Sequence, residues 1–266
     1  MKIIVCVKQV PDTSGKVAVN PDGTLNRASM ATITNPDDLN AVEAALVLKE
    51  QTGAEVVVVC MGPPPAEGML RECLARGCDR AVLVSGREFG GSDTYATSQI
   101  LAAAINKIGV EAEDIVMCGR QAIDGDTAQV GPQIAEKLGL PQISYAADIQ
   151  LDGNTVTVKR MLEDGYMTVK TQTPCLITCI KELNEPRYMS VYGIFDCYSK
   201  PYEVLDYNAL KDDPLIDPST IGLMGSPTNL LTSFTPPQKG AGMMLEGADK
   251  ATCDQLAGML AAKHMI

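Results

Sequence analysis

One glycine-containing loop carries the residue types best suited to binding an anion. Residues 119–130 read GRQAIDGDTAQV, and we expect a buried strand to end at Gly119 and a helix to begin near Thr127. Such a loop presents unpaired backbone amides and the positive end of the helix dipole to a phosphate. The sequence therefore predicts a phosphate or pyrophosphate held by the amides of residues 127–129 and by the Thr127 hydroxyl.

Acidic side chains in the same loop leave a second interpretation open. Asp126 and Gln129 have the spacing of a capping box, so Asp126 could simply cap the helix while nothing binds. Asp124 and Asp126 would also repel a phosphate unless both side chains point away from it. The chain contains neither GxGxxG nor GxxxxGK[ST], so the loop is neither a standard dinucleotide fingerprint nor a P-loop.

Two further segments also precede predicted helices, but their sequences indicate ligand binding less strongly. Gly90 and Gly91, in REFGGSDT, precede Asp93, which is expected to open a helix. This segment could bind an anion, or it could be a flexible loop followed by an N-cap. Asn35 and Pro36, before an earlier predicted helix, read on their own as a plain turn.

The composition excludes several kinds of chemistry. The 266 residues include a single histidine, His264, and no tryptophan, so we expect no catalytic histidine, no serine triad and no His-ligated metal. Thirty-three acidic and 22 basic residues give a net charge of −11, which repels nucleic acid and anionic membrane surfaces. Proteins and small molecules are therefore the expected partners.

The cysteines favour a reducing compartment. The nine cysteines form no CxxC pair, and several lie in apolar, strand-like runs, so we expect most to be small buried hydrophobic side chains. No apolar stretch approaches the ~20 residues needed to span a bilayer. Lys8 interrupts the apolar N-terminus and no small-residue cleavage site follows, which argues against a signal peptide. The expected location is the cytoplasm.

The strands and helices that are expected to position these loops alternate along the chain. Short apolar runs followed by amphipathic ones predict an α/β fold: a doubly wound, mostly parallel sheet with helices on both faces. Strands are predicted at residues 2–7, 55–61, 80–85 and 114–119, and helices at 35–51, 64–76, 92–107 and 127–138. Ligands bind beyond the carboxyl ends of parallel strands where the strand order reverses. That rule predicts a site formed by the loops 7–11, 61–63, 86–91 and 119–126.

The chain changes character after residue 142. A small β-hairpin addition is predicted from 144–151 and 155–160, with extended pieces at 167–169 and 175–179. The tail has weak, proline-interrupted segments and one amphipathic stretch at 250–263, so it buries too little apolar surface to fold alone. We expect a nucleotide-binding α/β domain over residues 1–200 and a C-terminal arm over 201–266 that packs on another chain.

Six segments in the same order resemble the β subunit of electron-transfer flavoproteins, over essentially the whole chain. They are Val7-Lys8-Gln9-Val10-Pro11-Asp12, Asn35-Pro36-Asp37-Asp38, Met61-Gly62-Pro63, residues 119–130, Leu183-Asn184-Glu185-Pro186-Arg187-Tyr188 and Ser233-Phe234-Thr235-Pro236-Pro237. The NEPRY turn and the RQAIDGDTAQ loop are the most specific. The resemblance implies a Rossmann-like adenine-nucleotide-binding domain, an α subunit that carries the redox FAD, and a C-terminal arm that wraps that partner.

The resemblance also implies roles for individual residues. The adenosine end of the ligand would be lined by Cys6, Asn35, Pro36, Asp37 and Met61. The phosphates would be held by the loop and helix start, namely Gly119, Arg120, Gln121, Ala122, Ile123, Asp124, Gly125, Asp126, Thr127, Ala128, Gln129 and Val130.

The family divides according to the ligand in this pocket. Respiratory members hold a structural AMP, whereas bifurcating members hold a second FAD that takes a hydride from NADH. The segments KQVPDT, DGDTAQVGP and REFGGSDT resemble the bifurcating branch, and small residues at 125, 127 and 128 leave room for a flavin dinucleotide. The resemblance thus implies FAD, with AMP as the alternative. The candidates for contacting NADH or the flavin edge are Arg87, Phe89, Gly90, Gly91 and Asp93.

The implied partners follow from the same branch. They are the electron-transfer flavoprotein α subunit, an acyl-CoA dehydrogenase, and ferredoxin or flavodoxin; no catalytic side chain is expected, since the flavin carries the chemistry. Respiratory members have several lysines after the residue matching Tyr188, but residues 189–200 contain one, so docking to the same dehydrogenases is not implied. The apolar, aromatic segment there remains a candidate docking surface. A non-bifurcating subunit with AMP and a stress-protein-like nucleotide-binding module are the rival interpretations.

Overall fold

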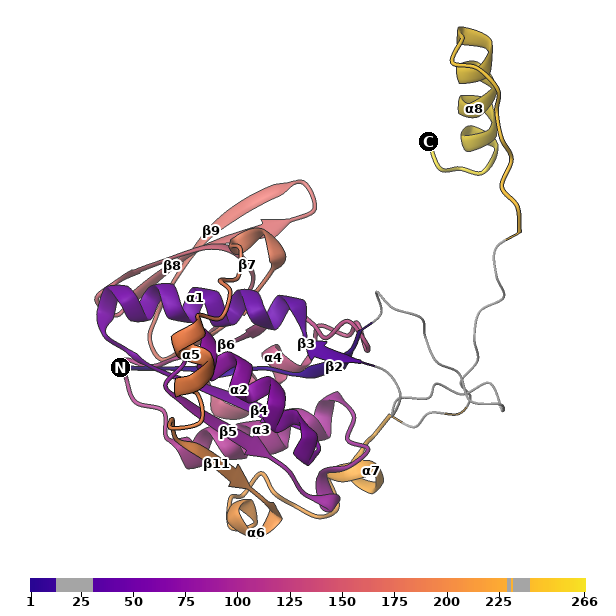
Figure 1. Cartoon of the computed structure of the whole chain (residues 1–266). Helices are drawn as coiled ribbons and strands as arrows, with labels where there is room; N and C mark the ends of the chain where they lie inside the picture. Colours follow the sequence, from indigo (N-terminus) through magenta and orange to yellow (C-terminus); the bar gives the residue numbers. More distant parts are fainter. Residues whose placement is uncertain (13–30, 229–230, 232–239) are drawn as a thin grey trace. The chain divides into compact units, whose positions relative to one another are not determined.

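A single nine-stranded sheet organises the protein. The computed structural model describes residues 1–12, 31–228, 231 and 240–266, and the strand order is β11-β5-β4-β1-β6-β10-β7-β8-β9 (Figure 1). Every pairing from β11 to β7 is parallel, whereas β7, β8 and β9 pair antiparallel. The strands are β1 Lys2–Cys6, β4 Glu55–Met61, β5 Arg80–Val84, β6 Ile115–Gly119, β7 Gln142–Asp152, β8 Thr155–Leu162, β9 Gly165–Gln172, β10 Cys175–Cys179 and β11 Tyr202–Leu205.

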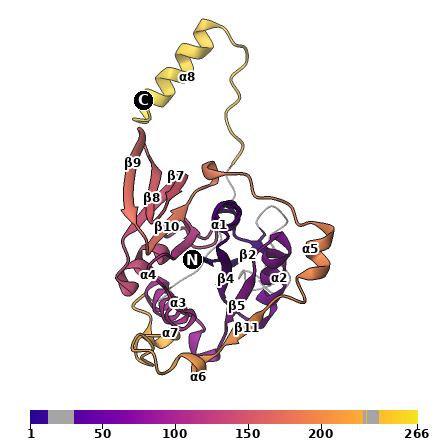
Figure 2. The same ribbon diagram turned by 90° about the vertical axis from the view of Figure 1, so that its left-hand side faces the viewer.

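Helices cover both faces of the parallel part of the sheet. Figure 2 shows α1, α2 and α5 on one side and α3 and α4 on the other. The helices are α1 Pro36–Thr52, α2 Glu67–Arg76, α3 Thr94–Ile108, α4 Val130–Leu138, α5 Val191–Asp196, α6 Tyr207–Leu210 and α7 Gly222–Gly225, with 3-10 turns at Pro64–Ala66, Arg87–Phe89 and Lys181–Leu183. A small two-stranded sheet pairs β2 Gln9–Pro11 with β3 Thr32–Thr34.

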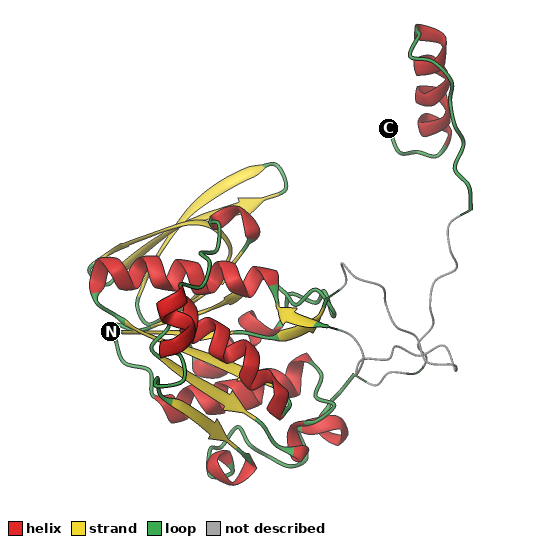
Figure 3. Cartoon of the chain, in the orientation of Figure 1, coloured by secondary structure: helices red, strands yellow, loops and turns green. Residues whose placement is uncertain are grey.

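Alternating residues of each strand enter two separate cores. Ile3 and Val5 pack with α1 and α2, while Ile4 and Cys6 pack with α3 and α4. Both faces of the strands are therefore buried, which explains why they read as continuous apolar runs. The predicted α/β class, the mostly parallel sheet and the β-hairpin addition are confirmed. The hairpin is extended by a third strand, so that β7, β8 and β9 form an antiparallel ribbon (Figure 3).

Residues beyond 200 contribute to this sheet. Strand β11 pairs with β5, with Tyr202 opposite Ala81, and Leu205 is buried. One compact unit comprises Met1–Ala18 and Leu25–Leu231. The sheet-bearing unit thus extends past the boundary at residue 200 that the sequence suggested, because a short, weak segment pairs with the open edge of β5.

A second unit comprises Val19–Thr24 and Thr232–Ile266. Its described part contains the helix α8, Lys250–Ala262, which agrees with the predicted amphipathic stretch. Asp249 caps this helix by accepting a hydrogen bond of 2.8 Å from the amide of Thr252. No residue of α8 is buried among the described residues. Thr13 and the motif at residues 233–237 lie outside the described residues.

Candidate functional site

A groove of about 1070 Å³ opens at the carboxyl ends of β1, β4, β5 and β6. The chain runs from β1 outward to β4 and β5 and then returns across the sheet to β6, so the strand order reverses between β1 and β6. This switch point is the usual ligand position in open α/β sheets. All four loops that the sequence placed at this edge line the groove.

Most of the predicted site residues meet in this groove. They are Cys6, Met61, Arg87, Phe89, Gly90, Gly91, Asp93, Gly119, Arg120, Gln121, Ala122, Asp124, Gly125, Asp126, Thr127, Ala128, Gln129 and Val130. Four predicted residues, Asn35, Pro36, Asp37 and Ile123, are not among the residues that line the groove. Of these, Asn35 contacts the loop through its side chain.

The backbone of the 119–130 loop offers amides to the groove. The amides of Gly125 and Asp126 both donate to the carbonyl of Ala122, at 3.2 and 2.9 Å. The next three amides are those of residues 127–129, and none of them donates a hydrogen bond to an acceptor among the described residues. Consecutive free amides in such a turn form a concave anion site. The loop thus has the donors that the sequence predicted for a phosphate.

The start of the following helix differs from the prediction. Helix α4 begins at Val130, not at Thr127, because Asp126 and Ala128 have positive φ angles of 50° and 52° and cannot belong to a right-handed helix. Gln129 occupies the N-cap position without a side-chain capping bond. The predicted capping box is therefore wrong. The free amides belong to the turn that precedes the helix.

The acidic side chains of the loop are engaged by partners. Lys8 Nζ binds both carboxylate oxygens of Asp124, at 2.8 and 2.9 Å, across two of the groove loops. Asp126 Oδ1 accepts a hydrogen bond of 2.8 Å from Gln121 Nε2. These contacts reduce the repulsion that we expected between the two carboxylates and a phosphate. The charge of Asp124 is paired with the Lys8 ammonium, and the carboxylate of Asp126 is hydrogen-bonded within the loop.

Two side chains at the start of α1 hold the loop in place through hydrogen bonds to its backbone. Asn35 is fully buried; its Nδ2 donates to the carbonyl of Gln121 at 2.8 Å, and its Oδ1 accepts from the amide of Ile123 at 3.1 Å. Asp38 accepts hydrogen bonds of 2.8 Å from the amides of Lys8 and Gly119. The carboxyl ends of β1 and β6 are thereby tied to one helix. The Asn35-Pro36 segment is a structural brace and not a plain turn.

Burial controls the protonation of the groups in the groove floor. Desolvation raises the pKa of Asp38 to about 7, against the opposing effect of the amides of Gly119 and Lys8. Desolvation likewise raises the pKa of the Cys6 thiol to about 12 and that of Cys118 well above its usual value, so neither is a thiolate nucleophile at neutral pH. Within the described ranges, no cluster of three or more His, Cys, Asp or Glu side chains could hold a metal ion.

The second glycine-rich loop borders the other side of the groove. Asp93 caps α3 by accepting from the amide of Ala96 at 3.0 Å, and its other oxygen accepts from Thr228 at 2.9 Å. Phe89 is buried in the core beneath the loop. Thr94 at the start of α3 donates to Gln129 Oε1 at 3.1 Å, which links the two glycine-rich loops.

Sequence reasoning missed the helical part of the lining. Thr97 and Leu101 of α3, and Gly131 and Ile134 of α4, face the groove. The two residues of each pair are four or three positions apart, so they share one face of a helix that follows a ligand loop, and this spacing was the available signal. Asp38 was also missed as a lining residue, although it belongs to the recognised Asn35-Pro36-Asp37-Asp38 segment.

A second surface lies away from the groove. The segment 188–198, which includes α5, exposes a cluster of apolar side chains. The most exposed are Tyr188 at 95%, Val191 at 74%, Tyr192 at 77%, Phe195 at 78% and Tyr198 at 73%. Large exposed apolar clusters commonly mark interaction sites. Across the described residues, no helix is both long and apolar enough to pass through a membrane.

Comparison with known proteins gives consistent matches. The model of the electron transfer flavoprotein domain matches residues 22–204. The acryloyl-CoA reductase electron transfer subunit gamma of Anaerotignum propionicum is 66% identical over 100% of both chains. The caffeyl-CoA reductase-Etf complex subunit CarD of Acetobacterium woodii is 51% identical over 99% of this chain and 97% of its own. The electron transfer flavoprotein subunit beta of Clostridium acetobutylicum is 49% identical over 100% of both.

Proposed function

Because the chain belongs to the electron transfer flavoprotein family as a β subunit, we propose that it holds an FAD in the groove of a bifurcating heterodimer. The heterodimer would oxidise NADH and divide the electrons between ferredoxin or flavodoxin and an acyl-CoA dehydrogenase. The names of two relatives, subunits of acryloyl-CoA and caffeyl-CoA reductase systems, support an acyl-CoA dehydrogenase-type partner.

The size of the groove supports a flavin dinucleotide over a mononucleotide. Its volume of about 1070 Å³ lies just above the ~300–1,000 Å³ usual for small-molecule sites. Gly125 has no atom within 4 Å of a Cβ built on it, so the loop leaves open space beside the free amides. This combination of open backbone, free amides and volume is the observation that carries the FAD proposal.

The residues of this chain bind and orient; they do not react. A bound flavin supplies the acceptance of hydride and the transfer of single electrons. The amides of residues 127–129 would hold the phosphates, and Asn35 and Asp38 would keep the loop in place. The raised pKa values of Cys6 and Cys118 keep uncharged groups in the floor of the groove.

The loop at Arg87–Phe89 and the following glycines are proposed as the side from which NADH approaches. Gly91 has a φ of 77°, a backbone conformation that favours glycine, in the exposed turn that follows Arg87–Phe89. The Arg87 side chain could pair with a pyrophosphate.

The segment 188–198 is the proposed docking surface for the acyl-CoA dehydrogenase. Aromatic side chains dominate the energetics of protein interfaces, and this segment exposes three tyrosines and a phenylalanine. The arm at the C-terminus is the proposed contact with the α subunit, since α8 has no buried residue of its own.

The count and identity of the nucleotides released from the purified heterodimer test the proposal. Two flavins per heterodimer, one of them reduced by NADH, are expected. One flavin with one AMP would contradict bifurcation and favour the non-bifurcating alternative.

A further inference from the structure

A late segment of the chain holds the second glycine-rich loop of the groove, residues 86–93. Residues 220–228, which we call the strap, contain α7 and lie against this loop. The amide of Gly222 donates a hydrogen bond of 3.1 Å to Ser92 Oγ, 130 positions away in the chain. The Ser92 hydroxyl in turn donates to the carbonyl of Phe89 at 2.8 Å. Ser92 therefore links the strap to the base of the loop, where Phe89 is buried.

The buried hydroxyl of Ser226 is the centre of these contacts. Ser226 is only 5% exposed. Its Oγ accepts a hydrogen bond of 2.8 Å from the amide of Asp93 and donates one of 2.7 Å to the carbonyl of Gly222. The amide of Thr228 donates to Asp93 Oδ2 at 2.9 Å, so the strap binds both the backbone and the side chain of Asp93. Without the Ser226 hydroxyl, the amide of Asp93 would lose its acceptor, which is unfavourable for a donor that is shielded from water.

The strap and the loop approach each other too closely for side chains at two positions. A Cβ built on Gly91 would lie 2.8 Å from Leu223 Cβ, and one built on Gly222 would collide with the carbonyl of Glu88. Both glycines also have positive φ angles, 77° and 65°. Close by, the amide of Leu223 donates to the carbonyl of Gly90 at 2.9 Å. The two backbones are therefore packed directly against each other along the turn of the loop.

The strap is itself fixed to the fold. Gln99 of α3 is buried, and its Nε2 donates to the hydroxyl and the carbonyl of Thr220 at 2.8 and 3.2 Å. Ile221 is buried in the core that α3 and α4 share with the sheet. The strap thus offers the loop a fixed support.

The strap reaches the groove through the loop. Every residue of the loop except Glu88 lines the groove, whereas none of residues 220–228, all of which the structure describes, does so. A change in the strap is therefore expected to affect a ligand in the groove by altering the loop.

We propose that Ser226 is a positioning residue for the nicotinamide nucleotide, and that the strap holds the loop at 86–93 in the shape that receives NADH without touching the ligand. This inference rests on the proposed function, in which NADH approaches from this side of the groove. A loop that is already ordered loses little conformational entropy when a ligand binds. If the loop adopts its binding shape for only a fraction of the time, the apparent affinity falls by that fraction.

The test uses the heterodimer with its α subunit and follows flavin reduction after rapid mixing with NADH at increasing concentrations. Ser226→Ala should raise the Kd for NADH by about tenfold while the limiting rate of reduction stays unchanged. The amides of residues 86–93 should exchange hydrogen faster. Flavin content should not change, because the amides proposed to hold the phosphates belong to the loop at 119–130.

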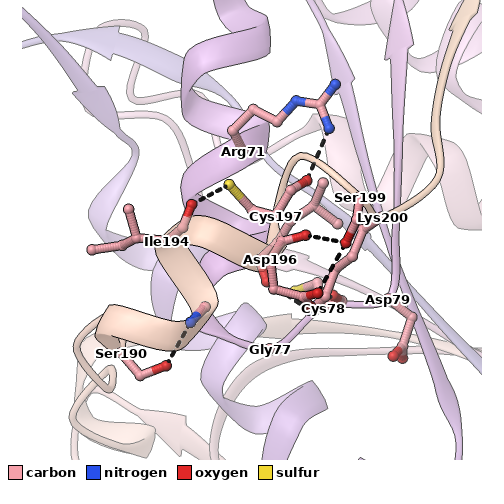
Figure 4. Close-up of polar contacts among 12 residues, drawn as sticks. Arg71, Gly77, Cys78, Asp79, Ser190, Ile194, Asp196, Cys197, Ser199 and Lys200 are labelled. Atoms are coloured by element: carbon pink, nitrogen blue, oxygen red, sulfur yellow. Dashed lines mark hydrogen bonds and ion pairs between the residues drawn. The ribbon is translucent and has the colours of Figure 1, made fainter.

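Two further variants sharpen the test. Thr228→Pro removes the amide that binds Asp93 at the exposed end of the strap, and should raise the Kd in the same way even if Ser226→Ala does not fold. Ser199→Ala is the control. Ser199 Oγ donates to the carbonyl of Asp196 at 2.7 Å, outside the groove (Figure 4), so the loss of this hydroxyl should leave the Kd for NADH unchanged.

The outcomes separate this inference from the function on which it rests. NAD⁺, which binds without reducing the flavin, should slow the hydrogen exchange of residues 86–93 in the unchanged heterodimer. If NAD⁺ protects these amides while Ser226→Ala and Thr228→Pro change neither the Kd nor the exchange, the positioning role is wrong. An equal rise in Kd for Ser199→Ala would also overturn it. If NADH does not reduce the flavin, or NAD⁺ protects no amide of the loop, the proposed approach of NADH fails, and this inference fails with it.

Discussion

The carboxylate of Asp38 accepts a hydrogen bond of 2.8 Å from the amide of Gly119, so the first turn of α1 holds the last residue of β6. The other oxygen of Asp38 binds the amide of Lys8 at the same distance, just beyond β1. One buried side chain therefore spans the two strands between which the strand order reverses. The groove keeps its shape through this contact and through Asn35 beside it.

Asp38 should make stability depend on pH. Its pKa in the folded protein is about 7, raised by burial from an ordinary value of 3.8, so folding favours the protonated form. The contribution of Asp38 is complete below the ordinary value and is lost as the pH rises through about 7. Between these limits, the free energy of unfolding should fall by up to about 1.4 kcal/mol per pH unit relative to Asp38→Asn. Thermal or urea unfolding of both proteins from pH 4 upward measures this difference, and parallel curves would contradict it.

Gly119→Ala should destabilise the protein. A Cβ at this position would lie 2.6 Å from the Asp38 nitrogen, so α1 or β6 must move. A loss of about 1–3 kcal/mol in the free energy of unfolding is expected. Gly68→Ala in α2 is the control, since nothing lies within 4 Å of its Cβ, and it should be neutral or stabilising by up to about 1 kcal/mol. Equal stability of the two variants would show that the close approach at Gly119 is unimportant.

Thr127→Asp should lower the occupancy of flavin in this subunit. The Thr127 side chain is exposed in the groove and its amide has no acceptor among the described residues, so a carboxylate there would face the bound phosphates. A reduction in affinity of about tenfold or more is expected. Thr127→Asn has nearly the same shape without the charge and should retain most of the flavin. Unchanged flavin content in Thr127→Asp, measured by absorbance after gel filtration, would refute the assigned phosphate cradle.

Removing residues 234–266 should weaken the heterodimer. This deletion takes away α8 and leaves the sheet-bearing unit, which ends at Leu231. Helix α8 has no buried residue among those that the structure describes, and we expect its apolar side chains to pack on the α subunit. Co-purification with the α subunit and titration of the two subunits measure the effect. A truncated chain that still binds the α subunit with full affinity would exclude the arm as a contact.

The prediction of strands and helices was accurate where it depended on local sequence patterns. The sequence predicted β4 at its observed residues, and it placed β1, β5, β6 and the helices between them within a few residues, but it did not predict β11. Helix α4 was predicted to begin too early because Thr127 and Gln129 are compatible with a helix. Their neighbours Asp126 and Ala128 adopt left-handed backbone angles in a loop that is held by bonds to Asn35, 88 positions away from Ile123. A contact between residues so far apart in the chain cannot be predicted from the sequence around residue 126.

By itself, the sequence determined the alternation of strands and helices and the four loops at one edge of the sheet, and it predicted the glycine loop as the candidate anion site, because these depend on apolar periodicity and on short-range turn chemistry. The tertiary structure alone decided which side chains face the groove. It left Asn35 and Asp37 out of the lining, put Thr97 and Ile134 into it, and paired Asp124 with Lys8, 116 positions away. These outcomes depend on strand order and on contacts between distant segments, which appear only when the chain is folded.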